Sequence, residues 1–386
     1  MATKVLTGDP SQARQTFKLI DCDIHPNFAL PWRQELAPFM PREWAIRFSS
    51  GEDYHGSNRG ERGSVGYRLP HNCFYPRTGG AAMRMDLMGP NGEAPATNPV
   101  VSAHELLDAY AIDRAILIPQ DAQAIGVFPD PDVAIEFAAA TNRWIADKWL
   151  SSDSRWRGTI TVAIQDPPRA AEEIRRWAQD SRFAAIYLSL SNVLMGHRSL
   201  YPIYAAAQEY ELPITVHPEG AEGIYVTAPQ WAGGPPTHYL DHRMNFGLSY
   251  QASLSNLVAT GVFERFPQLR VVFTEFGYAW LPEFLWRIDT IWKSQRDATP
   301  WVKRPPSEYV IEHCRFSTQP FIEPSRPEFV DQIFEMIHAG QVLMFSTDYP
   351  HWDSEAPEQI LDKLPAKFKS QILWETAAAL YGRRLV

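Results

Sequence analysis

The sequence contains little cysteine and no long apolar run. Its three cysteines, Cys22, Cys73 and Cys314, lie far apart with no C-x-x-C spacing, which argues against both a disulfide framework and a thiolate zinc site. No stretch approaches the roughly 18 apolar residues of a membrane span, and the polar segment 1–15 lacks the apolar core of a signal peptide. We therefore expect a cytoplasmic protein that does not enter a membrane.

The sequence also lacks clusters of positive charge and phosphate-binding loops. Its 386 residues carry a formal net charge of -9 without any lysine- and arginine-rich run, which argues against a nucleic acid or an anionic membrane as partner. No G-x-G-x-x-G or G-x-x-x-x-G-K-[ST] loop follows a predicted strand, so an open nucleotide-binding sheet loses its main support. A small organic molecule is the expected partner.

What the chain does contain is a regular alternation of apolar strands and helical segments from residue 100 onward. Its composition, 45% hydrophobic and 21% charged, is that of a globular protein with a large core. Near-continuous apolar strands separated by helices predict a parallel sheet covered on its outside, and eight such units predict a closed (β/α)8 barrel, the TIM-barrel fold. We expect one domain over 17–386, with strands at 18–24, 114–119, 157–164, 183–190, 212–217, 269–275, 313–318 and 341–348.

Two long segments, 26–99 and 218–242, interrupt this alternation and are rich in proline and glycine. The first shows no sustained helical period, and a connection of this length inside a compact protein is usually functional or disordered. Its aromatic residues, which include Phe28, Trp32 and Trp44, indicate that it packs on the rest of the chain. We predict that both segments form a cap over the mouth of the barrel.

Ionisable residues stand at the ends of four predicted strands. Asp23 and His25 end the first strand, His217 the fifth, Glu275 the sixth and Asp348 the eighth, whereas the other strands end in apolar or small uncharged residues. Catalytic groups of a (β/α)8 barrel lie at the carboxyl ends of its strands. One histidine at a strand end is more often structural than a ligand, but these coincidences at equivalent places favour a single shared site.

Four motifs follow one another in a specific order and spacing. They are I-D-C-D-I-H-P at 20–26, L-P-I-T-V-H-P at 212–218, F-S-T-D-Y-P-H at 345–351 and I-L-W-E-T-A-A-A-L-Y-G at 372–382. Together they resemble the amidohydrolase-2 family, metal-dependent barrel enzymes related to aminocarboxymuconate-semialdehyde decarboxylase. The resemblance covers nearly the whole chain from residue 19, and it implies a barrel, a bound metal ion and a homodimer.

Carried over position by position, the resemblance implies a metal site whose four ligands are Asp23, His25, His217 and Asp348. Two positions depart from the family pattern: Asp23 replaces the first histidine of the frequent His-x-His pair, and Glu275 stands where the sixth strand often carries a histidine. The fourth strand offers no lysine that could be carbamylated to bridge two ions, so we expect one divalent ion. A mixed nitrogen and oxygen donor set suits Zn2+, with Mn2+ as the alternative.

Three residues are candidates for the chemistry itself. Asp348 is expected to act as ligand and proton acceptor, and Glu275 as a second base, a further ligand or a substrate contact. His351, three residues beyond Asp348, is either a hydrogen-bond donor to a developing oxyanion or a loop histidine on the rim.

Hydrolysis of an amide, ester or lactone-like carbonyl by a metal-activated water is our first functional interpretation. Non-oxidative decarboxylation of an aromatic or conjugated acid is the alternative. It needs cationic help, for which Arg243 and Arg287 are candidates, and we expect Glu275 to repel such a substrate. A glycosidase using Glu275 and Asp348 would leave the remaining three ligand residues without a role, and a non-catalytic binding protein would carry no metal.

Overall fold

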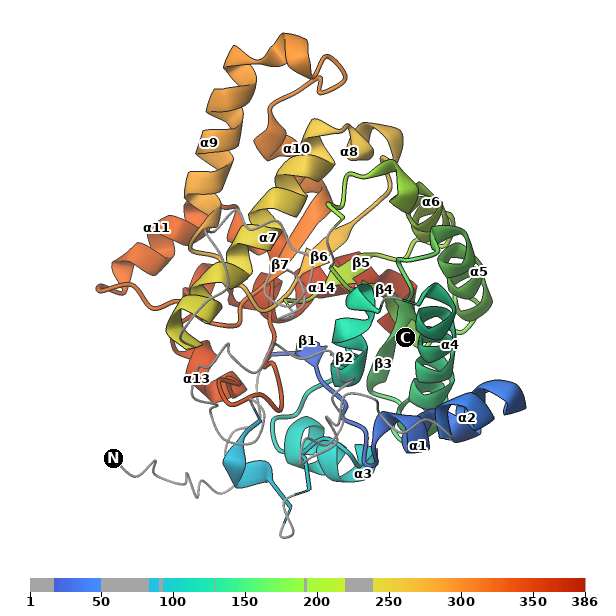
Figure 1. Ribbon diagram of the computed structural model, residues 1–386. Helices are drawn as coiled ribbons and strands as arrows, with labels where there is room; N and C mark the ends of the chain where they lie inside the picture. The colour runs from blue at the N-terminus through green and yellow to red at the C-terminus, as the bar shows by residue number, and fades with distance from the viewer. Residues whose placement is uncertain are drawn as a thin grey trace.

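The computed structural model describes residues 17–49, 83–89, 93–128, 130–190, 193–218 and 239–385. Within these residues eight parallel strands follow one another around a single sheet, each hydrogen-bonded to the next (Figure 1). The strands are β1 (Ile20–Ile24), β2 (Arg114–Leu117), β3 (Trp156–Val162), β4 (Phe183–Leu188), β5 (Ile214–Val216), β6 (Val271–Phe273), β7 (Cys314–Ser317) and β8 (Leu343–Met344).

Contacts between β1 and the segment after β8 join the two edges of this sheet. The backbone N–H of Cys22 donates to the carbonyl of Phe345 at 3.0 Å, and the N–H of Asp348 donates to the carbonyl of Asp23 at 3.1 Å. Ile24 and Tyr349 form a further parallel bridge. The predicted (β/α)8 TIM-barrel fold is therefore confirmed.

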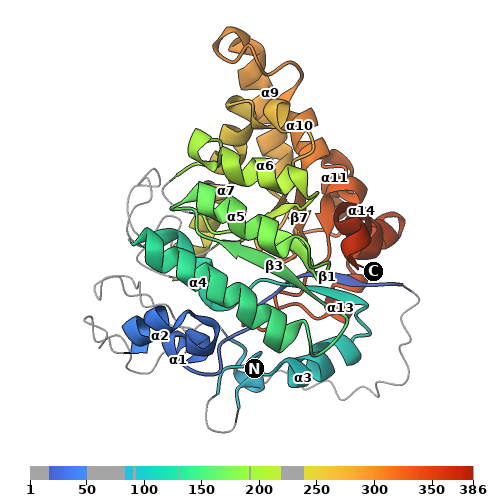
Figure 2. The same ribbon diagram turned by 90° about the vertical axis from the view of Figure 1, so that its right-hand side faces the viewer.

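Helices cover the outside of the barrel. Figure 2 shows α4, α5 and α6 side by side along one flank, and α9 projecting away from the strands. Among the described residues, none of the helices combines the length and the apolar character that crossing a membrane requires. The main helices are α3 (Pro99–Ser102), α4 (Pro131–Trp144), α5 (Pro167–Trp177), α6 (Tyr201–Glu209), α7 (Tyr239–Ala259), α8 (Val262–Arg265), α9 (Leu281–Ser294), α10 (Pro306–His313), α11 (Glu328–Met336), α12 (Ala339–Val342), α13 (Pro357–Leu361) and α14 (Thr376–Tyr381).

The segments predicted to form a cap lie partly outside the described residues, which omit 50–82, 90–92 and 219–238. The described beginning of the first segment contains two helices, α1 (Trp32–Leu36) and α2 (Arg42–Ser49). Helices of five and eight residues are too short to show a sustained 3.6-residue period, which is why the sequence pattern did not reveal them.

The eighth strand is much shorter than predicted, and this places Asp348 on a turn rather than on a strand. Beyond β8 the backbone takes other hydrogen-bond partners: the N–H of Phe345 donates to the carbonyl of Ile372, and the N–H of Thr347 donates to the carboxylate of Asp21 at 3.0 Å. Strand β8 therefore ends before the polar residues of this motif begin, although single backbone contacts to β1 continue at Asp348 and Tyr349.

The first strand also departs from strict alternation. Its register against β2 shifts between Asp21 and Ile24, so residues two apart do not stay on one face along this strand. Asp21 accepts hydrogen bonds from the backbone and hydroxyl of Thr347. Of Asp21, Asp23 and His25, only the last two belong to the site described below.

The C-terminal segment fills the amino-terminal end of the barrel. Tyr381 and Leu385 pack in one cluster with residues of the strands: Ile20, Cys22, Ile116, Ala184, Ala185, Val272 and Met344. The carbonyl of Arg384 accepts a hydrogen bond from the guanidinium of Arg157 on β3. Because this end is packed with side chains, polar groups can gather only at the opposite, carboxyl end of the strands.

Candidate metal centre

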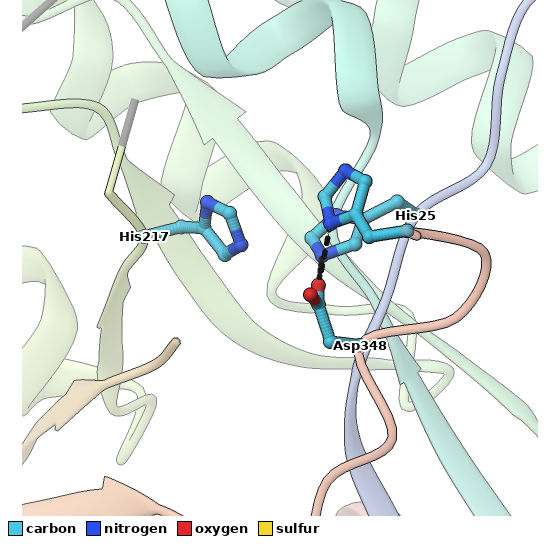
Figure 3. Close-up of side chains that lie close together, drawn as sticks. His25, His217 and Asp348 are labelled. Carbon is cyan, nitrogen blue, oxygen red and sulfur yellow. Dashed lines mark hydrogen bonds and ion pairs between the residues drawn. The ribbon is translucent and has the colours of Figure 1, made fainter. Parts of the chain in front are cut away.

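The residues predicted from the strand ends meet at one place. His25 follows β1, His217 follows β5 and Asp348 follows β8, and each is almost completely buried. Figure 3 shows the His217 ring facing His25 and Asp348, which are joined by a hydrogen bond. One possible ligand atom from each of these three residues and from His351 lies within 4.8 Å of the others. Side chains more than 320 positions apart in the sequence, such as His25 and Asp348, therefore form one compact group.

Two further carboxylates complete the surroundings of this group. Asp23 Oδ1 lies 3.2 Å from His25 Nε2, and Asp23 Oδ2 lies 3.7 Å from His217 Nε2. Glu275 Oε2 lies 3.0 Å from the same nitrogen of His217. The structure thus brings together the residues that the sequence analysis named as metal ligands or as candidates for the chemistry itself.

The hydrogen bonding of these side chains tests whether they fit a metal ion. Among the described residues, no group makes a hydrogen bond of good geometry to either carboxylate oxygen of Asp23, either ring nitrogen of His217 or Oδ2 of Asp348, although all five atoms are buried. Leaving buried polar atoms unsatisfied costs free energy. Carboxylate oxygens and imidazole nitrogens that converge without other partners are a donor set for a divalent cation. The residues therefore fit a metal ion.

The electrostatics of the group agree with a cation site. Burial raises the pKa of Asp348 to about 8, and the negative charge of Glu275 adds to this effect. At His25 burial opposes the charged form, but the carboxylates of Asp23 and Asp348 outweigh it and raise its pKa well above the usual range. Both directions reflect an excess of negative charge in a buried space, which a divalent cation would relieve.

His351 behaves differently from His25. Burial and the neighbouring charge of His25 lower the pKa of His351 to about 4, so its ring is neutral near pH 7. Its Nδ1 lies 2.6 Å from Asp348 Oδ1, and its side chain is buried. The rim position considered in the sequence analysis is therefore excluded for this histidine.

Local backbone geometry presents the two acidic residues at the mouth. Asp348 has a φ of 61° and Glu275 a φ of 53°, both in the left-handed region that non-glycine residues rarely adopt. The turn at Glu275 is held because its N–H donates to the hydroxyl of Ser317 at 2.8 Å. Strained backbone of this kind tends to occur at functional sites.

Sequence reasoning missed two residues that contact the site. Gln120 and Gln123 lie on the 3-10 helix η4 (Gln120–Val127), just after β2. Gln123 Nε2 lies 3.1 Å from His25 Nδ1, and Gln120 Oε1 lies 2.9 Å from His351 Nε2. Both lie beyond the last residue of β2, outside the strand ends from which the site was predicted. The polar run Q-D-A-Q at 120–123, directly after an apolar strand, was the available signal.

The two arginines considered for a substrate carboxylate have different outcomes. Arg287 lies on α9, where its exposed side chain pairs with Glu283 one turn earlier. The Arg243 side chain lies outside the described residues.

Comparisons with known proteins place the chain in a family. A family model described as Amidohydrolase matches residues 20–383. A gamma-resorcylate decarboxylase of Rhodococcus jostii is 28% identical over 263 residues, which cover 64% of this chain and 75% of that protein.

Solved structures with the same fold include further decarboxylases. The 5-carboxyvanillate decarboxylase of Sphingomonas paucimobilis aligns over 95% of this chain and 99% of its own, with a TM-score of 0.65 and 18% identity. A dihydroxybenzoic acid decarboxylase of a Polaromonas species, solved with manganese and the inhibitor 2-nitroresorcinol, covers 95% and 97%, with a TM-score of 0.61 and 20% identity. At these identities the likeness supports the fold alone.

These findings correct the first functional interpretation. The curated relatives are named as decarboxylases, so the expectation of hydrolysis was wrong and the alternative is favoured. The repulsion expected between Glu275 and an acidic substrate would be offset by a divalent cation bound in this group.

Proposed function

The chain belongs to the amidohydrolase-2 family, and from this premise we propose that it is a metal-dependent decarboxylase of an aromatic carboxylic acid. The observation that carries the proposal is a buried carboxyl group at the centre of a metal-binding group. Asp348 is completely buried, and its Oδ1 lies 2.9 Å from His25 Nε2 and 2.6 Å from His351 Nδ1. A carboxyl group that is fixed in this way beside the reacting carbon can deliver a proton to a substrate.

We propose that Asp23, His25, His217 and Asp348 hold one divalent ion, Zn2+ or Mn2+. The buried atoms without hydrogen-bond partners belong to Asp23, His217 and Asp348, and the manganese in the Polaromonas neighbour supports the second choice. When bound, the ion supplies positive charge that neutralises these carboxylates and attracts the carboxylate of a substrate.

The role proposed for Asp348 follows from the chemistry of the reaction. Loss of CO2 from an aromatic acid replaces a carbon–carbon bond at the ring with a carbon–hydrogen bond. A proton must therefore reach the ring carbon that carries the carboxylate, and the electrons of the broken bond return to the ring as CO2 leaves. Asp348 is the proposed donor of this proton.

His351 and Glu275 support this step in the proposal. His351 Nδ1 lies 2.6 Å from Asp348 Oδ1, and a hydrogen bond between them orients this carboxyl group. Glu275 lies 4% exposed at the end of β6, where its carboxylate can accept a hydrogen bond from a ring hydroxyl group of the substrate. Burial of all three side chains limits the access of water to the reacting carbon.

The proposal is tested by incubating the metal-loaded protein in D2O with hydroxylated benzoic acids, including 2,6-dihydroxybenzoate and 5-carboxyvanillate. We expect CO2 release and a product that carries one deuterium at the carbon that lost the carboxylate. Cleavage of esters or amides without CO2 release from any acid would contradict it. Heat-denatured protein is the control for spontaneous decarboxylation.

A further inference from the structure

A closed ring of hydrogen-bonding contacts passes through five side chains at the candidate metal centre. Asp348 Oδ1 lies 2.9 Å from His25 Nε2 and 2.6 Å from His351 Nδ1. His351 Nε2 lies 2.9 Å from Gln120 Oε1, Gln120 Nε2 lies 3.1 Å from Gln123 Oε1, and Gln123 Nε2 lies 3.1 Å from His25 Nδ1. His25 and His351, which both face the carboxylate of Asp348, are thus also connected through the two glutamines at their other ring nitrogens.

The contacts of His25 Nδ1 cannot all be satisfied at once. This nitrogen lies 3.0 Å from the carbonyl oxygen of Ile118 and 3.1 Å from the amide nitrogen of Gln123. A carbonyl oxygen only accepts, so it requires a hydrogen on Nδ1, whereas an amide nitrogen only donates and requires a lone pair there. The orientation of the Gln123 amide therefore decides which nitrogen of His25 carries the hydrogen.

Metal binding by His25 requires one of the two orientations. Its Nε2 is the nitrogen that faces Asp23 and Asp348, so Nε2 must offer its lone pair to the ion, and the hydrogen must then be on Nδ1. That hydrogen is donated to Ile118 and to the oxygen of a Gln123 amide turned by 180°. Histidine ligands in metal sites generally donate their other ring hydrogen in this way.

A turned Gln123 amide forces Gln120 to turn as well. Each amide presents oxygen on one side and nitrogen on the other, so the turned Gln123 would place its nitrogen against the nitrogen of Gln120. Two donors cannot bond to each other, so Gln120 turns and offers its oxygen instead. The Gln120 nitrogen in turn donates to His351 Nε2, which leaves the hydrogen of His351 on Nδ1, facing Asp348. Because the hydrogen bonds through both glutamines must all point the same way, the tautomer of His25 sets the tautomer of His351.

We propose that Gln120 and Gln123 are positioning residues that link metal ligation by His25 to the tautomer of His351. The loop that carries them has other anchors: the hydroxyl of Ser189 donates to the carbonyl of Gln123 at 2.5 Å, and Gln165 Nε2 donates to the carbonyl of Ile125 at 2.7 Å. Their side-chain amides are therefore not needed to hold the loop in place. In the metal-bound protein they keep a hydrogen on His351 Nδ1 that is donated to Asp348.

The test uses Gln120→Glu, because a carboxylate accepts from both sides. It takes hydrogens from the Gln123 amide and from His351 Nε2, so His25 keeps its hydrogen on Nδ1 while His351 gains one on Nε2. We expect nitrogen-15 NMR of the Zn2+-loaded variant to show a hydrogen on His351 Nε2 that the wild-type protein lacks, with metal content unchanged. The inference rests on the proposed function only for activity, where we expect kcat to fall about 10- to 100-fold with little change in KM.

Gln120→Leu separates positioning from a merely structural role. Leucine offers His351 no partner, so Asp348 alone sets the tautomer and keeps the hydrogen on Nδ1. We therefore expect a smaller loss of kcat in Gln120→Leu than in Gln120→Glu, the reverse of the order expected if the amide only filled space. Gln268→Glu, on the exposed surface, is the control for added charge.

The absence of a hydrogen on His351 Nε2 in Gln120→Glu, or a lower kcat in Gln120→Leu than in Gln120→Glu, would overturn the proposal. The NMR and metal measurements do not depend on turnover. If no acid releases CO2, the proposed function fails while the tautomer result still decides whether the ring positions the two histidines.

Discussion

His351 Nδ1 lies 2.6 Å from Asp348 Oδ1, and the two residues are three positions apart in the chain. The backbone N–H of His351 donates to the carbonyl of Asp348 at 2.9 Å, so a tight turn rather than a strand presents both side chains to the site. The same carboxylate oxygen is 2.9 Å from His25 Nε2. Asp348 is therefore held from two sides by imidazoles, which fixes the position of the proposed proton donor.

Replacing Asp348 by asparagine removes the transferable proton but keeps the size of the side chain. We expect kcat for decarboxylation to fall about 100- to 10,000-fold, the range that a positioned acid contributes, while the circular dichroism spectrum stays unchanged. The measurement is CO2 release at saturating substrate. Asp362→Asn changes an exposed carboxylate and is expected to retain wild-type turnover; a loss smaller than about tenfold in Asp348→Asn would speak against the assigned role.

His217→Ala removes a proposed ligand whose two buried ring nitrogens make no hydrogen bond of good geometry with the described residues. We expect purified wild-type protein to contain close to one equivalent of divalent metal, and the variant to contain far less, because a buried site that loses one ligand binds its ion more weakly. Elemental analysis of protein never exposed to chelator measures this. The exposed His104 provides the matched variant His104→Ala, and equal metal content in both variants would refute the ligand set.

Glu275→Asn relieves two unfavourable features at once. The φ of 53° at this residue is tolerated better by asparagine than by glutamate, and the substitution removes one buried carboxylate from a group that already contains two others. We expect the free energy of unfolding of the metal-free protein to rise by about 1 kcal/mol, while decarboxylase activity falls. Urea denaturation monitored by tryptophan fluorescence measures the first effect, and a lower unfolding free energy than wild type would argue against it.

Glu355, which does not belong to the proposed ligand set, makes the free energy of unfolding depend on pH. Burial raises the pKa of this carboxyl to about 7, against the opposing effect of a hydrogen bond from the backbone of Phe321. The folded state therefore holds a proton that the unfolded chain has already lost, and stability decreases as pH rises from about 4.5 to about 7. Glu355→Gln keeps an acceptor for Phe321, so we expect its unfolding free energy to decrease less over this range. Identical pH profiles for the two proteins would rule out this contribution.

Several features followed from the sequence because they depend on local pattern. Eight apolar strands between helical segments predicted the barrel, and the polar ends of four of these strands predicted which residues would meet, because the carboxyl ends of parallel strands share one rim. The motifs that carry Asp23, His217 and Asp348 likewise indicated a family, which the match over 20–383 confirms. The single domain with its cap, the homodimer and the cytoplasmic location stay predictions.

The tertiary structure decided the hydrogen-bond partners and the orientation of the site residues, whereas their identity was already visible in the sequence. The short β8 and the shifted register of β1 depend on which backbone groups find side-chain partners, and no local pattern fixes this. The polar run at 120–123 marked Gln120 and Gln123 only as candidates, because a glutamine after a strand becomes a histidine partner only when pairing of the strands places β2 beside β1. The sequence by itself determined which donors gather at the mouth. Only the fold decided how they are oriented, because hydrogen-bond direction depends on contacts between side chains that are distant along the chain.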